Sequence, residues 1–125
     1  MSNKKKVFIS YEYDQDKALK DLLIGQAQNP QCPFEVIDSS LIEAAKEDSW
    51  EETARMHISA ADLVIVLVGA STWRAPGVLK EIRLARSLDK KIIQLIGHKD
   101  RPHHRVKGAG RQYRWTWDNL EKILR

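Results

Sequence analysis

The sequence predicts an α/β fold, with a doubly wound, mainly parallel sheet of about four to five strands and helices on both faces. Short apolar runs rich in β-branched residues alternate with longer segments of helical periodicity, which is the pattern of right-handed βαβ units. The runs 62–69 and 91–97 are apolar almost throughout, as is typical of parallel strands covered on both sides. At 125 residues, the chain has the length of one domain. We therefore expect a single flavodoxin-like domain over 1–125, with the first and third strands adjacent.

The strands are located by apolar runs and by the turn residues that bound them. They are expected at 7–11, 34–38, 62–69 and 91–97. A strand that runs into a short helix also fits 111–120, where Tyr113, Trp115 and Trp117 alternate and would share one face if extended. These three aromatic side chains are expected to hold the end of the chain on the body of the domain.

The helices follow from apolar residues at helical spacing and from start signals. They are expected at 14–28, 49–60, from 76 to near 88, and at 115–125. In the first helix, Asp14 or Asp16 could cap the N-terminus, and Leu22 falls on the apolar stripe. In the second, Ser49 and Glu52 fit a capping box.

The third helix carries an acid at an unexpected place. Pro76 suits an early helical position because its missing N–H costs no hydrogen bond there. At about 100° per residue, Glu81 then lies at the flank of the apolar stripe that includes Ile82. The acid is expected either to be partly buried and functional or to pair with a cation such as Arg74 or Lys80.

Positive charge is concentrated in the last quarter of the chain. Residues 97–125 carry 8 Lys and Arg against 3 Asp and Glu, whereas residues 1–96 carry 13 against 14. Such a cluster suits a phosphate-bearing partner, and a solvated basic loop is the alternative. Nucleic acid is the least expected partner, because neither a recognition helix nor an aromatic platform on a sheet face is evident.

Several classes of site and location are excluded by missing patterns. No apolar run approaches the roughly 20 residues of a membrane-spanning helix, so no membrane partner is expected. The N-terminus leads into a strand without the apolar region of a signal peptide, and the single cysteine, Cys32, agrees with a reducing compartment. A cytoplasmic location is therefore expected. The glycine-rich dinucleotide and triphosphate motifs do not occur, and the histidines lack metal-ligand spacing, so neither a metal nor a bound cofactor is expected.

Six segments occur in an order that matches a known family. They are 7-VFISY-11, 62-DLVIVLVG-69, 71-STW-73, 78-VLKEI-82, 92-IIQLIGHKDR-101 and 113-YRWTWDNL-120. This set resembles the TIR-like domain family of the Thoeris anti-phage system, the family of its ThsB subunit. The resemblance runs over nearly the whole chain and implies a flavodoxin-like fold. Many TIR domains cleave the nicotinamide–ribose bond of NAD, and some join the ADP-ribose product into a cyclic signal, so NAD would be a substrate here rather than a cofactor.

The resemblance also implies a set of site residues. By it, Glu81 matches the catalytic glutamate of TIR domains. The substrate-binding candidates are Ser10, Tyr11, Asp38, Ser71 and Trp73. Ser10 and Tyr11 end the first strand, where they could contact the ribose or the nicotinamide ring, and Trp73 could supply a stacking face. Tyr11 and Trp73 could equally be core or rim aromatics, and Asp38, where the family's mobile loop begins, could be a turn or cap residue.

One position departs from the family pattern. Family members commonly have a tryptophan four residues before the catalytic acid, and this chain has Gly77 there, with Trp73 displaced into the preceding loop. The wall of the pocket is therefore expected to differ.

Two classes of function follow from the resemblance. The first is an enzyme that consumes NAD during phage infection and acts on a separate effector protein through a diffusible signal. The second is a non-catalytic TIR-like module that binds a nucleotide, or associates with other copies through its TIR surface.

Overall fold

In this computed structural model, the described residues are 4–13, 15–37, 47–97 and 103–124. The strands are β1 (Lys5–Ser10), β2 (Phe34–Val36), β3 (Leu63–Val68), β4 (Lys91–Ile96) and β5 (Arg111–Arg114). They form one sheet in the order β2-β1-β3-β4-β5, and every neighbouring pair is parallel. The predicted fold class is confirmed, including the contact between the first and third strands.

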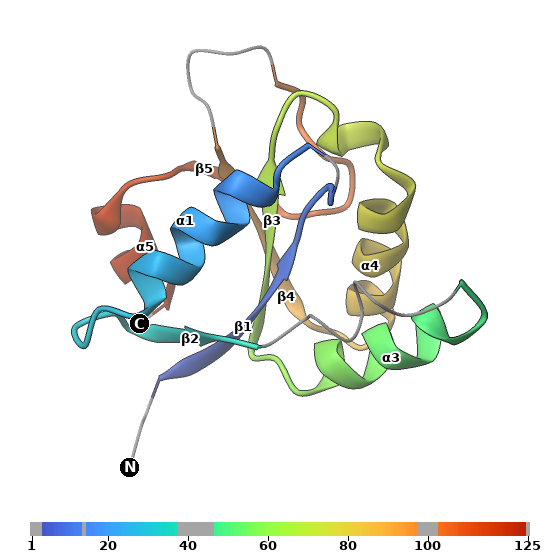
Figure 1. Cartoon of the computed structure of the whole chain (residues 1–125), viewed down its shortest axis with the longest axis horizontal. Coiled ribbons are helices and arrows are strands. Elements are labelled where there is room, and N and C mark those ends of the chain that lie inside the picture. The colour runs from blue at the N-terminus through green and yellow to red at the C-terminus, as the bar shows by residue number, and fades with distance from the viewer. Residues whose placement is uncertain (1–3, 14, 38–46, 98–102, 125) are drawn as a thin grey trace.

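Helices cover both faces of this sheet. They are α1 (Lys17–Ala27), α3 (Glu47–Ser59), the 3₁₀ turn η1 (Thr72–Arg74), α4 (Pro76–Ser87) and α5 (Trp117–Leu124). Figure 1 shows α1 and α5 on one side of the strands and α3 and α4 on the other. Among the described helices, none is long and apolar enough to cross a membrane.

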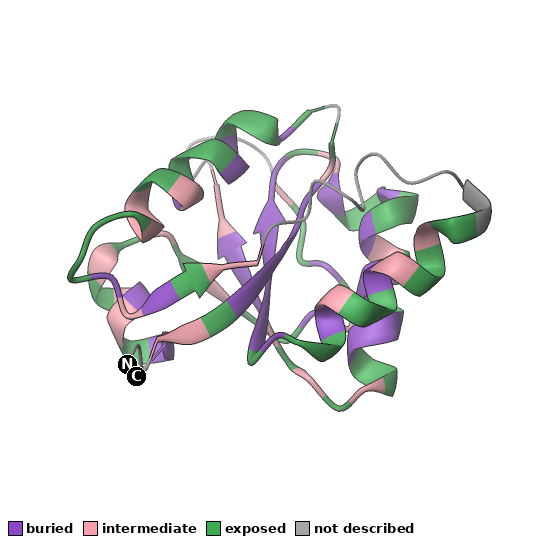
Figure 2. Cartoon of the chain, turned by 60° about the horizontal axis from the view of Figure 1, so that its bottom comes forward, coloured by how far each residue is buried: buried purple, intermediate pink, exposed green. Residues whose placement is uncertain are grey.

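The central strand β3 is buried along its whole length, as its apolar sequence predicts (Figure 2). Because side chains alternate along a strand, Ile65 and Leu67 belong to the core under α1 and α5, whereas Val64 packs with residues of α3 and α4. The same core under α1 and α5 contains Leu23 and Leu120. The sheet is therefore the shared wall of two apolar layers.

The end of the chain is held as expected. Tyr113, Trp115 and Trp117 are half-buried and pack against the core under α1 and α5. The indole Nε1 of Trp115 also donates a hydrogen bond to Gln26 Oε1 at 2.8 Å. The last segment is therefore joined to α1 by both apolar packing and a polar contact.

Two local predictions in the helices are wrong. Leu22 is 62% exposed, because α1 buries Leu19 and Leu23 on the side that faces the sheet and turns Leu22 outward. The helix α3 begins at Glu47, so Ser49 already lies inside the helix and is not its N-cap. The hydroxyl of Thr53, one turn later, donates instead to the Ser49 carbonyl.

A loop covers the sheet where the chain passes from β4 to β5. In the described part of this loop, 103–110, Val106 and Ala109 are buried against Val66 and Ile82. The backbone of Val106 is held by hydrogen bonds to Gln94, a fully buried residue of β4. This segment shows no period in the sequence because only a few of its residues face the core.

Candidate active site

Two polar side chains meet where β1 ends. Ser10 is the last residue of β1, and Glu81 lies in the second turn of α4. The Ser10 hydroxyl donates a hydrogen bond to Glu81 Oε1 at 2.7 Å, and the two residues are 0% and 1% exposed. Of the two expectations for this acid, burial is the one observed. The hydrogen bond therefore joins a strand to a helix through two residues that are 71 positions apart in sequence.

The hydrogen bond from Ser10 does not by itself offset the cost of burying Glu81. Removing a carboxylate from water costs several kcal/mol, whereas a hydrogen bond to a charged group contributes about 1.5 to 3 kcal/mol. An apolar residue would fill the same place at the flank of the apolar stripe with less cost. Buried acids of this kind gather at functional sites, which directs attention to the neighbourhood of Glu81.

A small hollow lies close to the Ser10–Glu81 pair along the chain, although neither of the two residues lines it. It has a volume of about 190 Å³ and lies between residues 11–13, after β1, and residues 75–78, at the start of α4. Tyr11 follows Ser10 in sequence, and Val78 lies just under one helical turn before Glu81. Gly77 also lines the hollow, and a Cβ added there would meet no atom within 4 Å. The missing tryptophan at this position therefore leaves open space.

Tyr11 forms part of the inner wall of this hollow. It is buried, and its ring lies 4.9 Å from the ring of Tyr13, with the planes tilted by 50°. The ammonium of Lys20 is 5.1 Å from the centre of the Tyr11 ring and donates to its hydroxyl at 3.4 Å. Tyr11 is thus a core aromatic, one of the two alternatives left open by the sequence, and it also lines the hollow.

A second polar group ties the loop after β1 to the loop after β3. The Thr72 hydroxyl accepts a hydrogen bond from the Gly69 N–H at 2.7 Å, and lies 3.1 Å from Asp16 Oδ2 and 3.2 Å from the Leu67 carbonyl. A Cβ at Gly69 would collide with the Asp16 carboxylate. The two loops are therefore locked together beside the candidate site.

The role of Asp16 was missed by sequence reasoning, which assigned this residue to a helix cap. Asp16 does occupy the N-cap position of α1, but its side chain makes no capping hydrogen bond. The carboxylate turns instead toward Gly69 and Thr72. The only signal in the sequence was that all three residues follow strands whose ends lie at the same edge of a parallel sheet. The other cap candidate, Asp14, lies outside the described residues.

Of the remaining candidates, two lie at or next to η1 and one lies outside the described residues. Trp73 is 41% exposed, and its ring lies 4.9 Å from the ring of His104 and 5.7 Å from the Arg74 guanidinium. Ser71 is half-buried just before η1. Neither residue lines the hollow beside Glu81. Asp38 lies outside the described residues.

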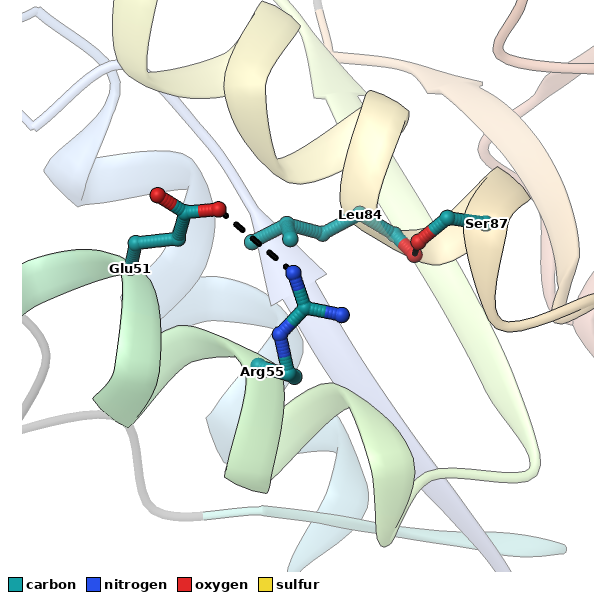
Figure 3. A network of polar contacts seen from close by, with 4 residues as sticks. All are labelled: Glu51, Arg55, Leu84 and Ser87. Carbon is teal, nitrogen blue, oxygen red and sulfur yellow. Dashed lines mark hydrogen bonds and ion pairs between the residues drawn. The ribbon is translucent and has the colours of Figure 1, made fainter.

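A larger groove separates α3 from α4 and has a different character. It has a volume of about 420 Å³ and is lined mainly by exposed charged side chains. In Figure 3, Glu51 and Arg55 on α3 form an ion pair of 3.5 Å in front of Leu84 on α4. Glu81 lines neither this groove nor the smaller hollow, but the residues next to Ser10 and the turn before Glu81 line the hollow. Within the described ranges, no group of three His, Cys, Asp or Glu side chains that could hold a metal ion occurs.

Comparison with solved structures supports the fold. The CMP N-glycosidase BcmB of Clostridium botulinum superposes with a TM-score of 0.60 at 23% sequence identity, over 95% of this chain and 97% of that one. A prokaryotic SEFIR domain superposes with a TM-score of 0.54 at 16% identity, over 94% and 86%. At such identities the likeness shows the fold alone.

Comparison of sequences identifies the family. No curated protein matches the chain significantly. The family described as "Thoeris protein ThsB, TIR-like domain" matches residues 8–102, a span that contains Ser10, the hollow and Glu81. The chain therefore belongs to the TIR-like domain family of the Thoeris protein ThsB.

Proposed function

We propose that this protein cleaves the nicotinamide–ribose bond of NAD and converts the ADP-ribose part into a cyclic signal in an anti-phage response. The observation that carries this proposal is the buried carboxylate of Glu81, held by Ser10 beside a hollow at the carboxyl end of the sheet. Ligands of open α/β sheets bind at this edge. Membership of the ThsB family supports NAD as the substrate.

The chemistry suits a carboxylate in this place. When nicotinamide leaves, positive charge develops on the ribose, and a fixed carboxylate that faces it lowers the energy of that state. The Ser10 hydrogen bond fixes the orientation of the Glu81 carboxylate before the substrate arrives. Burial excludes water, so the attraction is stronger than it would be at the surface. Contact with the ribose requires a wall side chain to move, and the exposed Tyr13 has the most room to do so.

The size of the hollow indicates which part of NAD it would hold. Small-molecule sites usually measure about 300 to 1,000 Å³. At about 190 Å³, the hollow suits the nicotinamide ring and its ribose rather than the whole dinucleotide. The Tyr11 ring would then lie beside the leaving nicotinamide.

A second candidate is cleavage of the N-glycosidic bond of a nucleoside monophosphate. The observation that favours it is the likeness to a CMP N-glycosidase over almost the whole of both chains. The bond broken is of the same kind, and a hollow of this size suits a base with its ribose equally well. Glu81 would have the same role in both reactions.

The experiment compares the wild-type protein with Glu81→Gln on NAD and, separately, on CMP. Release of nicotinamide or cytosine is followed by chromatography, and infected lysate is added if the pure protein is silent. Loss of a well-placed electrostatic group typically lowers a rate by about 10² to 10³. Arg83→Gln, an exposed change on the same helix, is the matched control and should keep the wild-type rate.

The outcomes separate the candidates. Release of nicotinamide by the wild type and its loss in Glu81→Gln supports NAD cleavage, and the same result with cytosine alone supports the second candidate. Equal release by wild type and Glu81→Gln removes this residue from catalysis. No release of either product under any condition favours a non-catalytic module that binds a nucleotide or another TIR surface.

A further inference from the structure

A basic groove lies between α4 and the loop that leads from β4 to β5. It is lined by Arg86 of α4 and by Arg105, Val106, Lys107, Gly108 and Gly110 of the loop, and its volume is about 520 Å³. It shares no lining residue with the hollow beside Glu81. We propose that this groove is a second binding site, which takes the oligophosphate group of a nucleotide-sized anion.

The charge of the groove selects the ligand. Three of its lining residues are cations, and none of those lining residues, all of which lie in the described part of the chain, is acidic. Placing like charges along one groove is unfavourable until an anion neutralises them. Phosphate groups accept several charge-assisted hydrogen bonds from arginine and lysine at once. The basic excess of residues 97–125 therefore contributes to a defined cavity.

The described part of the loop, which carries two of these cations, is fixed by hydrogen bonds to Gln94. Gln94 accepts a hydrogen bond from the Val106 N–H at 2.8 Å, and donates to the carbonyls of Val106 at 2.9 Å and Gly110 at 2.8 Å. Val106 itself is buried in the core beneath α4. Arg105 and Lys107, on either side of Val106, therefore project from an anchored backbone. A ligand that binds them loses less entropy than it would on a disordered tail.

Two glycines give the groove its shape. Gly108 and Gly110 have φ angles of 80° and 78°, in the left-handed region that favours glycine. A Cβ at Gly108 would lie 3.0 Å from Nη1 of Arg86, so the absence of a side chain lets the guanidinium reach across the loop. At Gly110, a Cβ would collide with the Ile92 carbonyl. The volume of the resulting groove falls within the range of small-molecule sites, about 300 to 1,000 Å³.

A neighbouring groove provides a matched control. It has a volume of about 510 Å³ along β5 and α5, and its cations are Lys91, Arg111, Arg114 and Lys122. Arg111 and Arg114 lie on β5, an edge strand of the sheet, so their charges have a structural explanation, which is to prevent pairing with other edges. Removing cations there changes the net charge of the protein as much as removing cations from the proposed site.

The test uses inorganic pyrophosphate as the probe and ¹⁵N-labelled protein at low salt. We expect pyrophosphate to shift the amide signals of Gly108 and Gly110 in a saturable way. The double change Arg105→Gln with Lys107→Gln should weaken binding by about tenfold or more, because each removes a charge-assisted contact. Arg114→Gln with Lys122→Gln should change it by less than about twofold. All four side chains are exposed, so melting temperatures without ligand should stay close to that of the wild type.

Further arms identify the source of the phosphate. If ADP binds more tightly than pyrophosphate and adenosine does not bind, the ligand is a nucleotide. If ADP and pyrophosphate bind equally, the groove recognises the oligophosphate group alone. The proposal is overturned if up to about 10 mM pyrophosphate leaves Gly108 and Gly110 unshifted, or if the two double variants weaken binding equally. It is also overturned if adenosine binds as ADP does, or if single-stranded DNA binds more tightly with length and depends on Arg114 and Lys122. None of these readouts requires cleavage of NAD.

Discussion

The region at the carboxyl end of β1 and the basic loop before β5 bury polar groups of opposite kinds. At the end of β1, the buried polar groups include the acids Glu81 and Asp16, whose carboxylates lie within hydrogen-bond distance of the Ser10 and Thr72 hydroxyls. Before β5, the buried polar group is the neutral amide of Gln94, and the charged residues Arg105 and Lys107 are exposed. A buried neutral amide that hydrogen-bonds backbone groups has a structural role that accounts for its burial. A buried carboxylate that an apolar residue could replace calls for a chemical role.

The largest loss of stability is expected from truncation after Gly110. This removes β5 and α5, including the fully buried Leu120 and the anchor at Trp115. Burial of large side chains contributes about 1.5 to 3 kcal/mol each, and several are lost together. Circular dichroism should show a chain that no longer unfolds cooperatively. A truncated chain that melts at the wild-type temperature would contradict the role assigned to the tail.

Gln94→Leu should cost less than truncation but several kcal/mol nonetheless. It leaves the Val106 N–H and two carbonyls without their buried partner, at about 1 to 3 kcal/mol for each unsatisfied group. Pyrophosphate binding should weaken, while cleavage of NAD below the melting temperature should persist. Gln112→Leu, which removes a single bond to Gln94, is the control and should have a smaller effect in chemical denaturation.

Thr72→Val should destabilise the protein by about 1 to 3 kcal/mol, because it leaves the buried Gly69 N–H unpaired at nearly constant volume. The Asp16 carboxylate also loses a neighbour, so the loops beside Glu81 loosen and turnover should fall with it. Thr72→Ser keeps the hydroxyl and should restore both properties. Equal melting temperatures for the valine and serine variants would argue against the bridge.

The smallest effect is expected at the ion pair of α3. Arg55 and Glu51 are exposed and lie one helical turn apart, so Arg55→Gln should change the free energy of unfolding by less than about 0.5 kcal/mol. Neither activity nor pyrophosphate binding should respond. A larger change in either property would show that the groove between α3 and α4 has a role of its own.

Much of the fold could be predicted because its signals are periodic. The unbroken apolar run of β3 and the helical spacing of Val78, Ile82 and Ala85 report burial directly, and the same spacing drew attention to Glu81. The alternating aromatic residues of the last segment predicted its short strand and helix, because this alternation is also a periodic signal of burial.

The missed features depend on contacts between distant parts of the chain. Asp16 has a plausible local role as a cap, and only its contact with Thr72, 56 residues away, reveals the other one. The exposure of Leu22 depends on how α1 turns against the sheet. The contact of Trp73 with His104, 31 residues along the chain, likewise has no signal in the local sequence. No local pattern encodes such directions.

The most direct measurement determines the melting temperature and the rate of nicotinamide release on the same preparations of wild type and Glu81→Gln. An amide is cheaper to bury than a carboxylate, and its carbonyl can still accept the Ser10 hydrogen bond. We therefore predict an unchanged or higher melting temperature, together with a rate lower by about 10² to 10³. A variant that melts several degrees lower while cleaving NAD at the wild-type rate would show that Glu81 serves the fold and not the reaction.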